Sequence, residues 1–92
     1  MNKILVVEDD ETIRNSLMIM LRIEGYEVYT AVDGKAGVER FDDSYNLVVM
    51  DIMMPRMSGI DASKKMREIS NIPILFLTAK SSEIDKIQGF DA

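Results

Sequence analysis

The 92-residue chain contains no cysteine and no histidine. Without cysteine it can form neither a disulfide framework nor a thiolate zinc site, and its composition permits a reducing compartment. Without histidine it has no imidazole metal ligand, no histidine-based triad and no histidine general base. Any catalysis or metal binding must therefore come from other side chains.

The sequence also lacks an excess of basic residues and any long apolar run. A net charge of −5 without a basic cluster argues against direct nucleic-acid binding by these residues. The N-terminal apolar run covers only residues 4–7, which is too short for the core of a signal peptide. No run approaches the roughly 20 residues that span a bilayer, so we expect a cytoplasmic protein that does not enter the membrane.

What is present is the composition of one globular domain. Hydrophobic residues make up 47% of the chain and charged residues 29%, which excludes a disordered chain. A domain of this size buries roughly 60–70% of the surface that its unfolded form exposes. The chain can therefore form a real but modest core.

Four segments have the pattern of strands. Continuous apolar runs at residues 4–7, 47–50 and 74–77 predict strands that are covered on both faces of a sheet. Residues 26–30 alternate between apolar and polar side chains, which predicts a strand nearer the sheet edge.

Between the strands, apolar residues recur at helical spacing. The first predicted helix contains Ile13, Leu17, Met20, Leu21 and Glu24 and ends at Gly25, and the second covers residues 35–42 after the turn Asp33–Gly34. A third helix follows Gly59 and contains Ile60, Met66 and Ile69. A fourth begins at about Ser82, with Ile84, Ile87 and Phe90 facing inward. Strands that alternate with helices predict an α/β fold, with a doubly wound parallel sheet and helices on both faces.

Acidic residues follow the predicted strands. In a doubly wound sheet the C-terminal ends of the strands share one edge, and ligands bind where the strand order reverses. The first strand leads into residues 8–10, which are all acidic, the third ends at Asp51, and the fourth ends at Thr78. If the strand order is 2-1-3-4, these acids converge. Crowded carboxylates repel each other and Mg²⁺ relieves the repulsion, so Asp51 is predicted to be a metal ligand, a nucleophile or both.

Each of these residues also has an ordinary structural explanation. The acidic residues 8–11 could complement the dipole of the following helix. Asp51 could be a turn residue, and threonine is common in strands, so Thr78 means little alone. The methionines near Asp51 suit core packing. The joint placement of the acids and Thr78 at one sheet edge is what favours a functional site.

Three ordered motifs resemble those of the receiver domains of two-component response regulators. Residues 4–10 resemble the first strand and acidic pair of that family, residues 51–59 its phosphoacceptor loop, and residues 76–80 its fourth strand with the signature hydroxyl. Asp33–Gly34 and residues 89–92 also fall where the family places such residues. The resemblance covers essentially the whole chain and implies a flavodoxin-like fold.

The resemblance implies a role for each residue of the site. Asp51 would accept a phosphoryl group from a phosphohistidine of a sensor histidine kinase. Asp9 and Asp51 would bind Mg²⁺ directly together with the backbone carbonyl of Met53, and Glu8 would act largely through water. Thr78 would donate a hydrogen bond to the phosphoryl oxygens.

Two residues of the same loop have a physical explanation in this reading. Pro55 fixes the loop that presents Asp51, and Gly59 permits a tight turn into the following helix.

The chain departs from the family at its C-terminal end. The fifth strand–helix unit of the family is missing, and with it the lysine that neutralises the phosphoryl group; Lys80 is not that residue. We therefore expect residues 1–92 to be a receiver domain that is incomplete at the C-terminus. The fourth strand would then be an exposed apolar edge, which predicts a homodimer or a domain swap through that edge.

The leading hypothesis is a phosphoprotein of a phosphorelay signal transduction system. Its only chemistry would be self-phosphorylation and autodephosphorylation, and its full-length protein would regulate transcription, as in the OmpR/PhoB-like branch. One alternative is a structural fragment that cannot switch. A weaker alternative is a Mg²⁺-dependent phosphatase with an aspartyl nucleophile, since such enzymes usually carry a second aspartate where this chain has Met53. A nucleotide-binding domain is not supported, because no glycine-rich phosphate loop follows the first strand.

Overall fold

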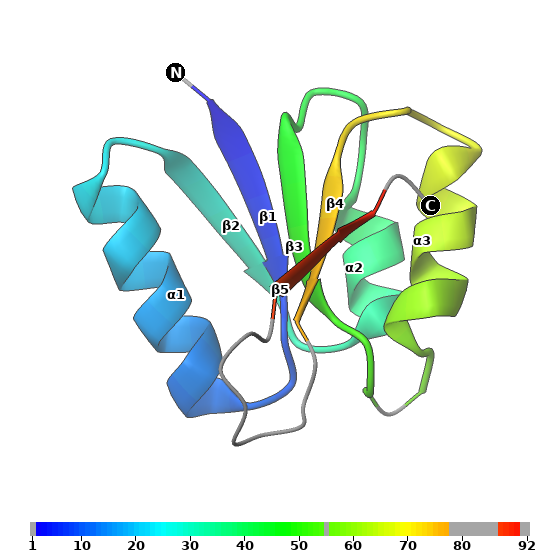
Figure 1. Cartoon of the computed structure of the whole chain (residues 1–92), viewed down its shortest axis with the longest axis horizontal. Coiled ribbons are helices and arrows are strands. Elements are labelled where there is room, and N and C mark those ends of the chain that lie inside the picture. Colours follow the sequence, from blue (N-terminus) through cyan, green and yellow to red (C-terminus); the bar gives the residue numbers. More distant parts are fainter. Residues whose placement is uncertain (1, 55, 78–86, 91–92) are drawn as a thin grey trace.

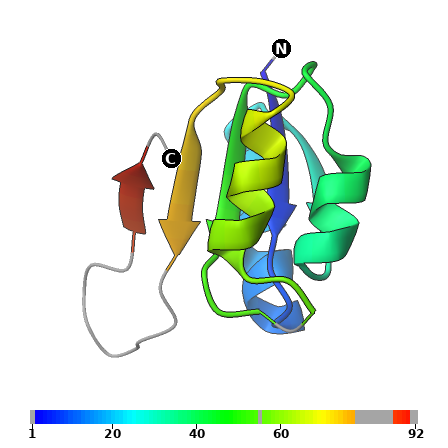
Figure 2. The ribbon, with the colours of Figure 1, turned by 90° about the vertical axis from the view of Figure 1, so that its right-hand side faces the viewer.

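The computed structural model describes residues 2–54, 56–77 and 87–90. Within these residues the strands form one central sheet with helices on both of its faces (Figures 1 and 2). The strands are β1 (Lys3–Val7), β2 (Glu27–Ala31), β3 (Leu47–Asp51), β4 (Ile74–Leu77) and β5 (Ile87–Phe90). The helices are α1 (Glu11–Ile23), α2 (Gly34–Arg40) and α3 (Gly59–Arg67). Helix α1 covers one face of the sheet, and α2 and α3 cover the other.

The sheet has the order β2-β1-β3-β4-β5, and its first four strands are parallel. Val7 at the end of β1 pairs with Ala31 on one side and with Met50 on the other, and Asp51 pairs with Leu77. The C-terminal ends of β1 to β4 therefore share one edge. The predicted parallel sheet with the order 2-1-3-4 is confirmed.

Each helix of the described residues begins at a side chain that caps its free N–H groups. The caps are Asp10 for α1, Asp33 for α2 and Ser58 for α3, and each accepts a hydrogen bond from a backbone N–H three residues later. Helix α1 ends before Gly25, as predicted, and this glycine has a φ of 99°. Within the described residues, no helix is long and apolar enough to cross a membrane.

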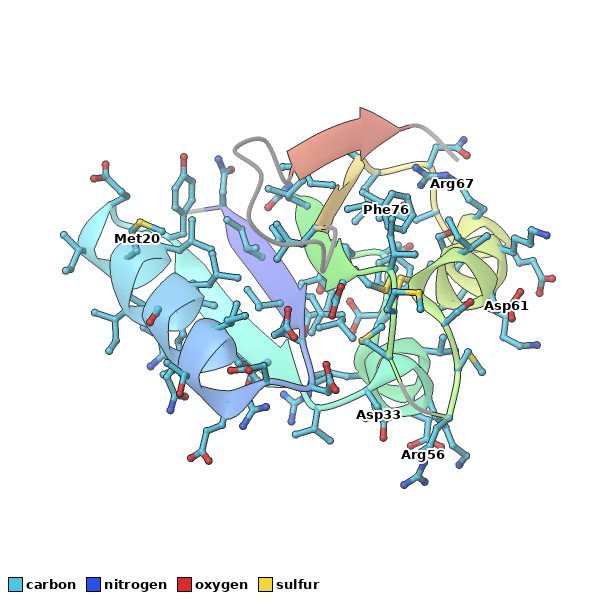
Figure 3. All side chains as sticks on the ribbon, turned by 60° about the horizontal axis from the view of Figure 1, so that its bottom comes forward. Met20, Asp33, Arg56, Asp61, Arg67 and Phe76 are labelled. Carbon is cyan, nitrogen blue, oxygen red and sulfur yellow. The ribbon has the colours of Figure 1, made fainter. Side chains whose placement is uncertain are left out.

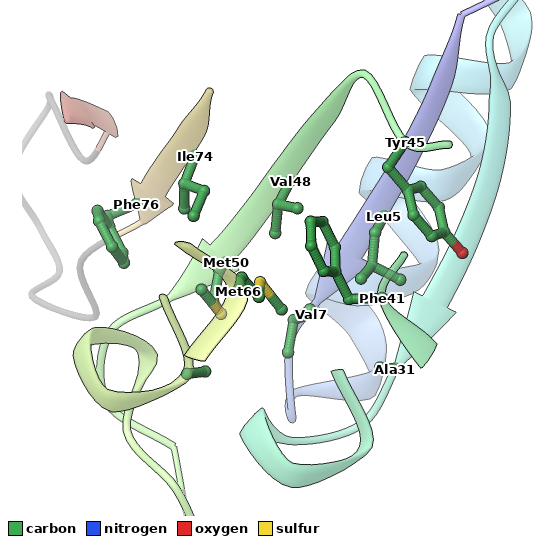
Figure 4. Close-up of a cluster of buried hydrophobic side chains, with 11 residues drawn as sticks. Leu5, Val7, Ala31, Phe41, Tyr45, Val48, Met50, Met66, Ile74 and Phe76 are labelled. Atoms are coloured by element: carbon green, nitrogen blue, oxygen red, sulfur yellow. The ribbon is translucent and has the colours of Figure 1, made fainter. Parts of the chain in front are cut away.

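The two faces of the sheet are packed differently. The larger buried cluster lies between the sheet and helices α2 and α3 (Figure 4), and its members are Leu5, Val7, Ala31, Phe41, Tyr45, Val48, Met50, Ala62, Met66, Ile74 and Phe76. The smaller cluster on the α1 face is Ile4, Val6, Val28 and Val49. No residue of α1 is buried. Most of the hydrophobic stabilisation therefore comes from the face that α2 and α3 cover.

The C-terminal segment differs from its prediction. Ile87–Phe90 form β5, which pairs antiparallel with β4, so the helix predicted to bury Ile87 and Phe90 is wrong for these residues. Residues 82–86, the rest of that helix, lie outside the described residues. The predicted exposed edge at β4 is also wrong, because β5 pairs with it. The homodimer or domain swap predicted through that edge therefore loses its structural basis. The physical reason is that an unpaired β4 would leave backbone donors and acceptors on its outer edge without partners. Strand β5 provides these partners.

Candidate functional site

Three acidic side chains meet where β1 and β3 end. One carboxylate oxygen from each of Glu8, Asp9 and Asp51 lies within 4.8 Å of the other two. Glu8 and Asp51 are only 3% and 6% exposed, whereas Asp9 is exposed. Glu8 and Asp9 directly follow β1, and Asp51 is the last residue of the adjacent strand β3. The parallel pairing of these two strands therefore brings the three carboxylates together.

The acidic stretch after β1 divides between the site and the helix. Glu8 and Asp9 belong to the acidic cluster, while Asp10 caps α1 and Glu11 lies in its first turn. The backbone N–H of Asp10 donates to Glu8 Oε2 at 3.0 Å, and the guanidinium of Arg14 donates to the Glu8 carbonyl at 3.0 Å. The helix-dipole explanation thus holds for the second half of the stretch, and the site explanation for the first half.

The surroundings of the cluster disfavour negative charge. Burial raises the pKa of Glu8 to about 7, and the nearby charges of Asp51 and Asp9 add to the effect, although the hydrogen bond from the Asp10 N–H opposes it. Burial also raises the pKa of Asp51, and the charge of Asp9 adds to this shift. A bound cation would reverse both shifts by favouring the ionised carboxylates. The electrostatics of the cluster therefore suit a divalent cation.

The donor set also fits magnesium. All three side chains offer hard oxygen ligands, which Mg²⁺ prefers. With bonds of about 2.1 Å in an octahedron, ligand oxygens lie roughly 3 to 4.2 Å apart. The carboxylate oxygens within 4.8 Å of one another need only small movements to reach such positions. A water between a carboxylate and the ion relaxes the requirement further, since Mg²⁺ usually keeps several waters.

The loop between β3 and α3 forms one wall of the site. Its Met53 N–H donates to Asp51 Oδ1 at 3.4 Å. The two ends of the loop are joined by a hydrogen bond from the Gly59 N–H to the Ile52 carbonyl at 2.8 Å. A Cβ at Gly59 would lie 2.3 Å from the Asp51 carbonyl oxygen, so only glycine fits where the loop returns to the strand.

The other predicted residues of the site fall outside the described parts of the chain. Thr78, Pro55 and Lys80 are not described, so their predicted roles stay predictions. The Met53 N–H donates to Asp51, and the role of the Met53 carbonyl as a metal ligand stays a prediction.

Two charged residues, Asp33 and Arg56, had no predicted role in the site. Asp33 was predicted to lie in the turn that begins a helix, and Arg56 lies on the β3–α3 loop itself. In the structure Arg56 Nε lies 3.4 Å from Asp33 Oδ2, which links the β3–α3 loop to the start of α2. An aspartate before a helix signals a cap, but no local pattern connects it to a residue in a later loop. Only the fold reveals this pair.

Comparison with known protein families and sequences points to one protein family. A family model described as the response regulator receiver domain matches residues 4–92. The chain is 53% identical over 87 residues to the uncharacterized transcriptional regulatory protein YrkP of Bacillus subtilis (strain 168). The aligned region covers 95% of the chain and 38% of YrkP. It is 41% identical over 91 residues to the transcriptional regulatory protein CpxR of Escherichia coli (strain K12), and this alignment covers 99% of the chain and 39% of CpxR. The chain thus spans about 40% of the length of these curated relatives.

Solved structures agree with the sequence relatives. The response regulator protein TrrA of Thermotoga maritima, solved in complex with Mg(2+)-BeF, superposes with a TM-score of 0.80 at 40% identity, over 88% of this chain and 72% of TrrA. The non-phosphorylated HemR receiver domain of Leptospira biflexa superposes with a TM-score of 0.82 at 29% identity, over 90% of this chain and 68% of that domain.

Proposed function

Because the chain belongs to the response regulator receiver domain family, we propose that it is the phosphoacceptor of a two-component system whose full-length protein regulates transcription. The observation that carries the proposal is the convergence of Glu8, Asp9 and Asp51 at the switch point of the sheet. The names of YrkP and CpxR support transcription as the output. The partner would be a sensor histidine kinase, and the site of action the cytoplasm.

Asp51 is the proposed nucleophile. One of its carboxylate oxygens attacks the phosphorus of a phosphohistidine, an O–P bond forms, and the N–P bond breaks as the imidazole leaves. The Met53 N–H orients the carboxylate by its bond to Oδ1. Phosphoryl transfer depends on positioning and charge neutralisation more than on acid–base groups, so a site without histidine suffices. The proposed chemistry is limited to self-phosphorylation and autodephosphorylation.

The remaining residues of the site hold the cation and the phosphoryl group. We assign direct Mg²⁺ ligation to Asp9 and Asp51, a third ligand to the Met53 carbonyl, and a contact through water to Glu8. Bound Mg²⁺ would neutralise the carboxylates and the charge of the transferring phosphoryl group. Thr78 would donate a hydrogen bond to the phosphoryl oxygens. That TrrA, at 40% identity, was solved in complex with Mg(2+)-BeF supports Mg²⁺ as the cation.

The phosphatase alternative lacks the second aspartate that such enzymes usually carry two residues after the nucleophile. The chain has Met53 at that position, and its thioether cannot transfer a proton. The alternative of a fragment that does not switch predicts no uptake of phosphate. Both alternatives therefore make predictions that differ from the proposal.

A mass measurement after phosphorylation separates these functions. We expect the protein, incubated with Mg²⁺ and acetyl phosphate, to gain the mass of one phosphate, and we expect a chelator to prevent the gain. Asp51→Asn should abolish it, whereas Asp61→Asn, at an exposed residue of α3, should not. No gain in the wild type would refute the proposal, and multiple turnover of a phosphoester would revive the phosphatase.

A further inference from the structure

The Asp33–Arg56 pair joins two segments that are far apart in the sequence. Figure 3 shows Asp33 at the start of α2 beside Arg56 on the loop that precedes α3. Arg56 Nε lies 3.4 Å from Asp33 Oδ2, and the side chains are 62% and 9% exposed, respectively. The pair therefore combines a largely buried carboxylate with a guanidinium at the surface.

Asp33 is a fixed partner. Its Oδ1 accepts a hydrogen bond from the Ala36 N–H at 2.8 Å, which caps α2. The cap holds the carboxylate in one orientation and leaves Oδ2 toward Arg56. A buried carboxylate also needs a compensating partner, and the guanidinium supplies the charge.

Arg56 has a backbone conformation that arginine adopts only at a cost. Its φ is 74°, and it is the only residue other than glycine with a positive φ in the described parts of the chain. Glycine or asparagine would make the same turn with less strain. Strained residues persist where the surrounding structure holds them. The arginine is therefore best explained by a contact of its side chain, and Asp33 is the contact that the structure provides.

Close backbone packing reinforces the contact. A Cβ at Gly34, the first residue of α2, would lie 2.3 Å from the Met57 carbonyl oxygen, so the loop rests directly on the helix. The loop is thus held at its root by Gly59 and farther out by α2. Met53, whose N–H donates to Asp51, lies on this loop.

We propose that the Asp33–Arg56 ion pair is a latch that positions the β3–α3 loop, and with it the Met53 backbone, for cation binding at Glu8, Asp9 and Asp51. The inference rests on the proposed function. A ligand that is already in place binds more tightly than one that must be ordered on binding. Because Arg56 is largely exposed, the expected gain in Mg²⁺ affinity is modest, at most about fivefold.

Arg56→Gln is the diagnostic variant. It keeps the side-chain length and the β-carbon but removes the charge. Removal of a positive charge from the protein would by itself strengthen the binding of Mg²⁺ to the acidic cluster. The latch predicts the opposite, a Kd that rises about threefold in isothermal titration calorimetry at low salt. Arg56→Lys should recover part of the affinity, and the difference from the wild type should shrink as salt is added.

Two further variants complete the set. The first is Asp33→Asn, which removes the charge but keeps a side-chain oxygen for the cap. Asp33→Asn and Arg56→Gln break the same ion pair, so the double variant should bind Mg²⁺ no more weakly than Asp33→Asn alone. Lys35→Gln is the matched control, because Lys35 and Glu39 form an ion pair on α2 at 2.9 Å whose side chains are also exposed. Its Mg²⁺ affinity should not fall.

A second readout uses the metal-free protein. Amide hydrogen exchange by NMR should be about threefold faster at Met53 in Arg56→Gln, with the Ile52 amide, which donates to the Leu77 carbonyl, unchanged. Unchanged exchange at Met53 together with unchanged or tighter Mg²⁺ binding would overturn the latch. A wild type that binds no Mg²⁺ would refute the proposed function instead, and the exchange measurement would still test the latch.

Discussion

Strands β1 and β3 each carry two kinds of buried residue, and the difference between them separates stability from function. Within the strands, Leu5 and Met50 are fully buried in the larger core. At the strand ends, Glu8 and Asp51 are almost as deeply buried but are carboxylates. Burial of apolar area stabilises the fold by roughly 25 cal/mol per Å², whereas burial of a carboxylate costs free energy unless it is compensated. The same sheet thus gains stability from its interior and loses some of it at its edge.

The largest expected loss of stability comes from the interior. Met66 of α3 is fully buried in the larger core. Met66→Ala should lower the free energy of unfolding by roughly 2 to 5 kcal/mol, because the change loses buried area and leaves a cavity. Urea denaturation at fixed pH measures the loss. A cost below about 1 kcal/mol would mean that the core relaxes around the gap, and the contrast with the acidic edge would weaken.

At the acidic edge, burial should lower the free energy of unfolding, because the folded state disfavours the ionised carboxylate of Glu8. The pKa of Glu8 is about 7 in the folded chain against an ordinary 4.5, so between these pH values the folded state binds more protons than the unfolded state. The free energy of unfolding of the metal-free protein should therefore fall as the pH rises through this window, by on the order of 2 kcal/mol. Denaturant titrations at several pH values test this slope, and Mg²⁺ should offset the loss at the upper end by binding the folded state.

Glu8→Gln isolates this effect. Glutamine cannot ionise, so the metal-free variant should lose most of the slope and be more stable than the wild type at the upper end of the window. Glu24→Gln, at an exposed position after α1, is the control and should keep the slope of the wild type. A wild-type slope that persists in Glu8→Gln would assign the pH dependence to another group.

The contrast between interior and edge also explains what the sequence could predict. Apolar runs and helical spacing are local signals, so the four parallel strands and the helices ending at Gly25 and beginning at Gly59 were predictable. The strand order then made the meeting of the acids at one edge a consequence of topology.

Features that depend on distant contacts or on backbone conformation were not predictable. The pairing of Asp33 with Arg56 needs the loop and the helix to be in place. The division of the acidic stretch at Asp10 depends on where α1 begins, which a run of four acids does not reveal. At residues 87–90 the strand β5 stands in place of the end of a predicted helix, because an available strand edge outweighed a weak local pattern.

The smallest expected effect tests the less densely packed face. Met20 lies on α1, which contributes no buried residue, and its side chain is 53% exposed (Figure 3). Met20→Ala removes the same atoms as Met66→Ala, but about half of their area is already in water, and alanine is the better helix former. The loss should therefore stay below about 1 kcal/mol in urea denaturation. If both substitutions cost the same, α1 packs against the sheet as tightly as α3, and the difference between the two faces would not follow from burial.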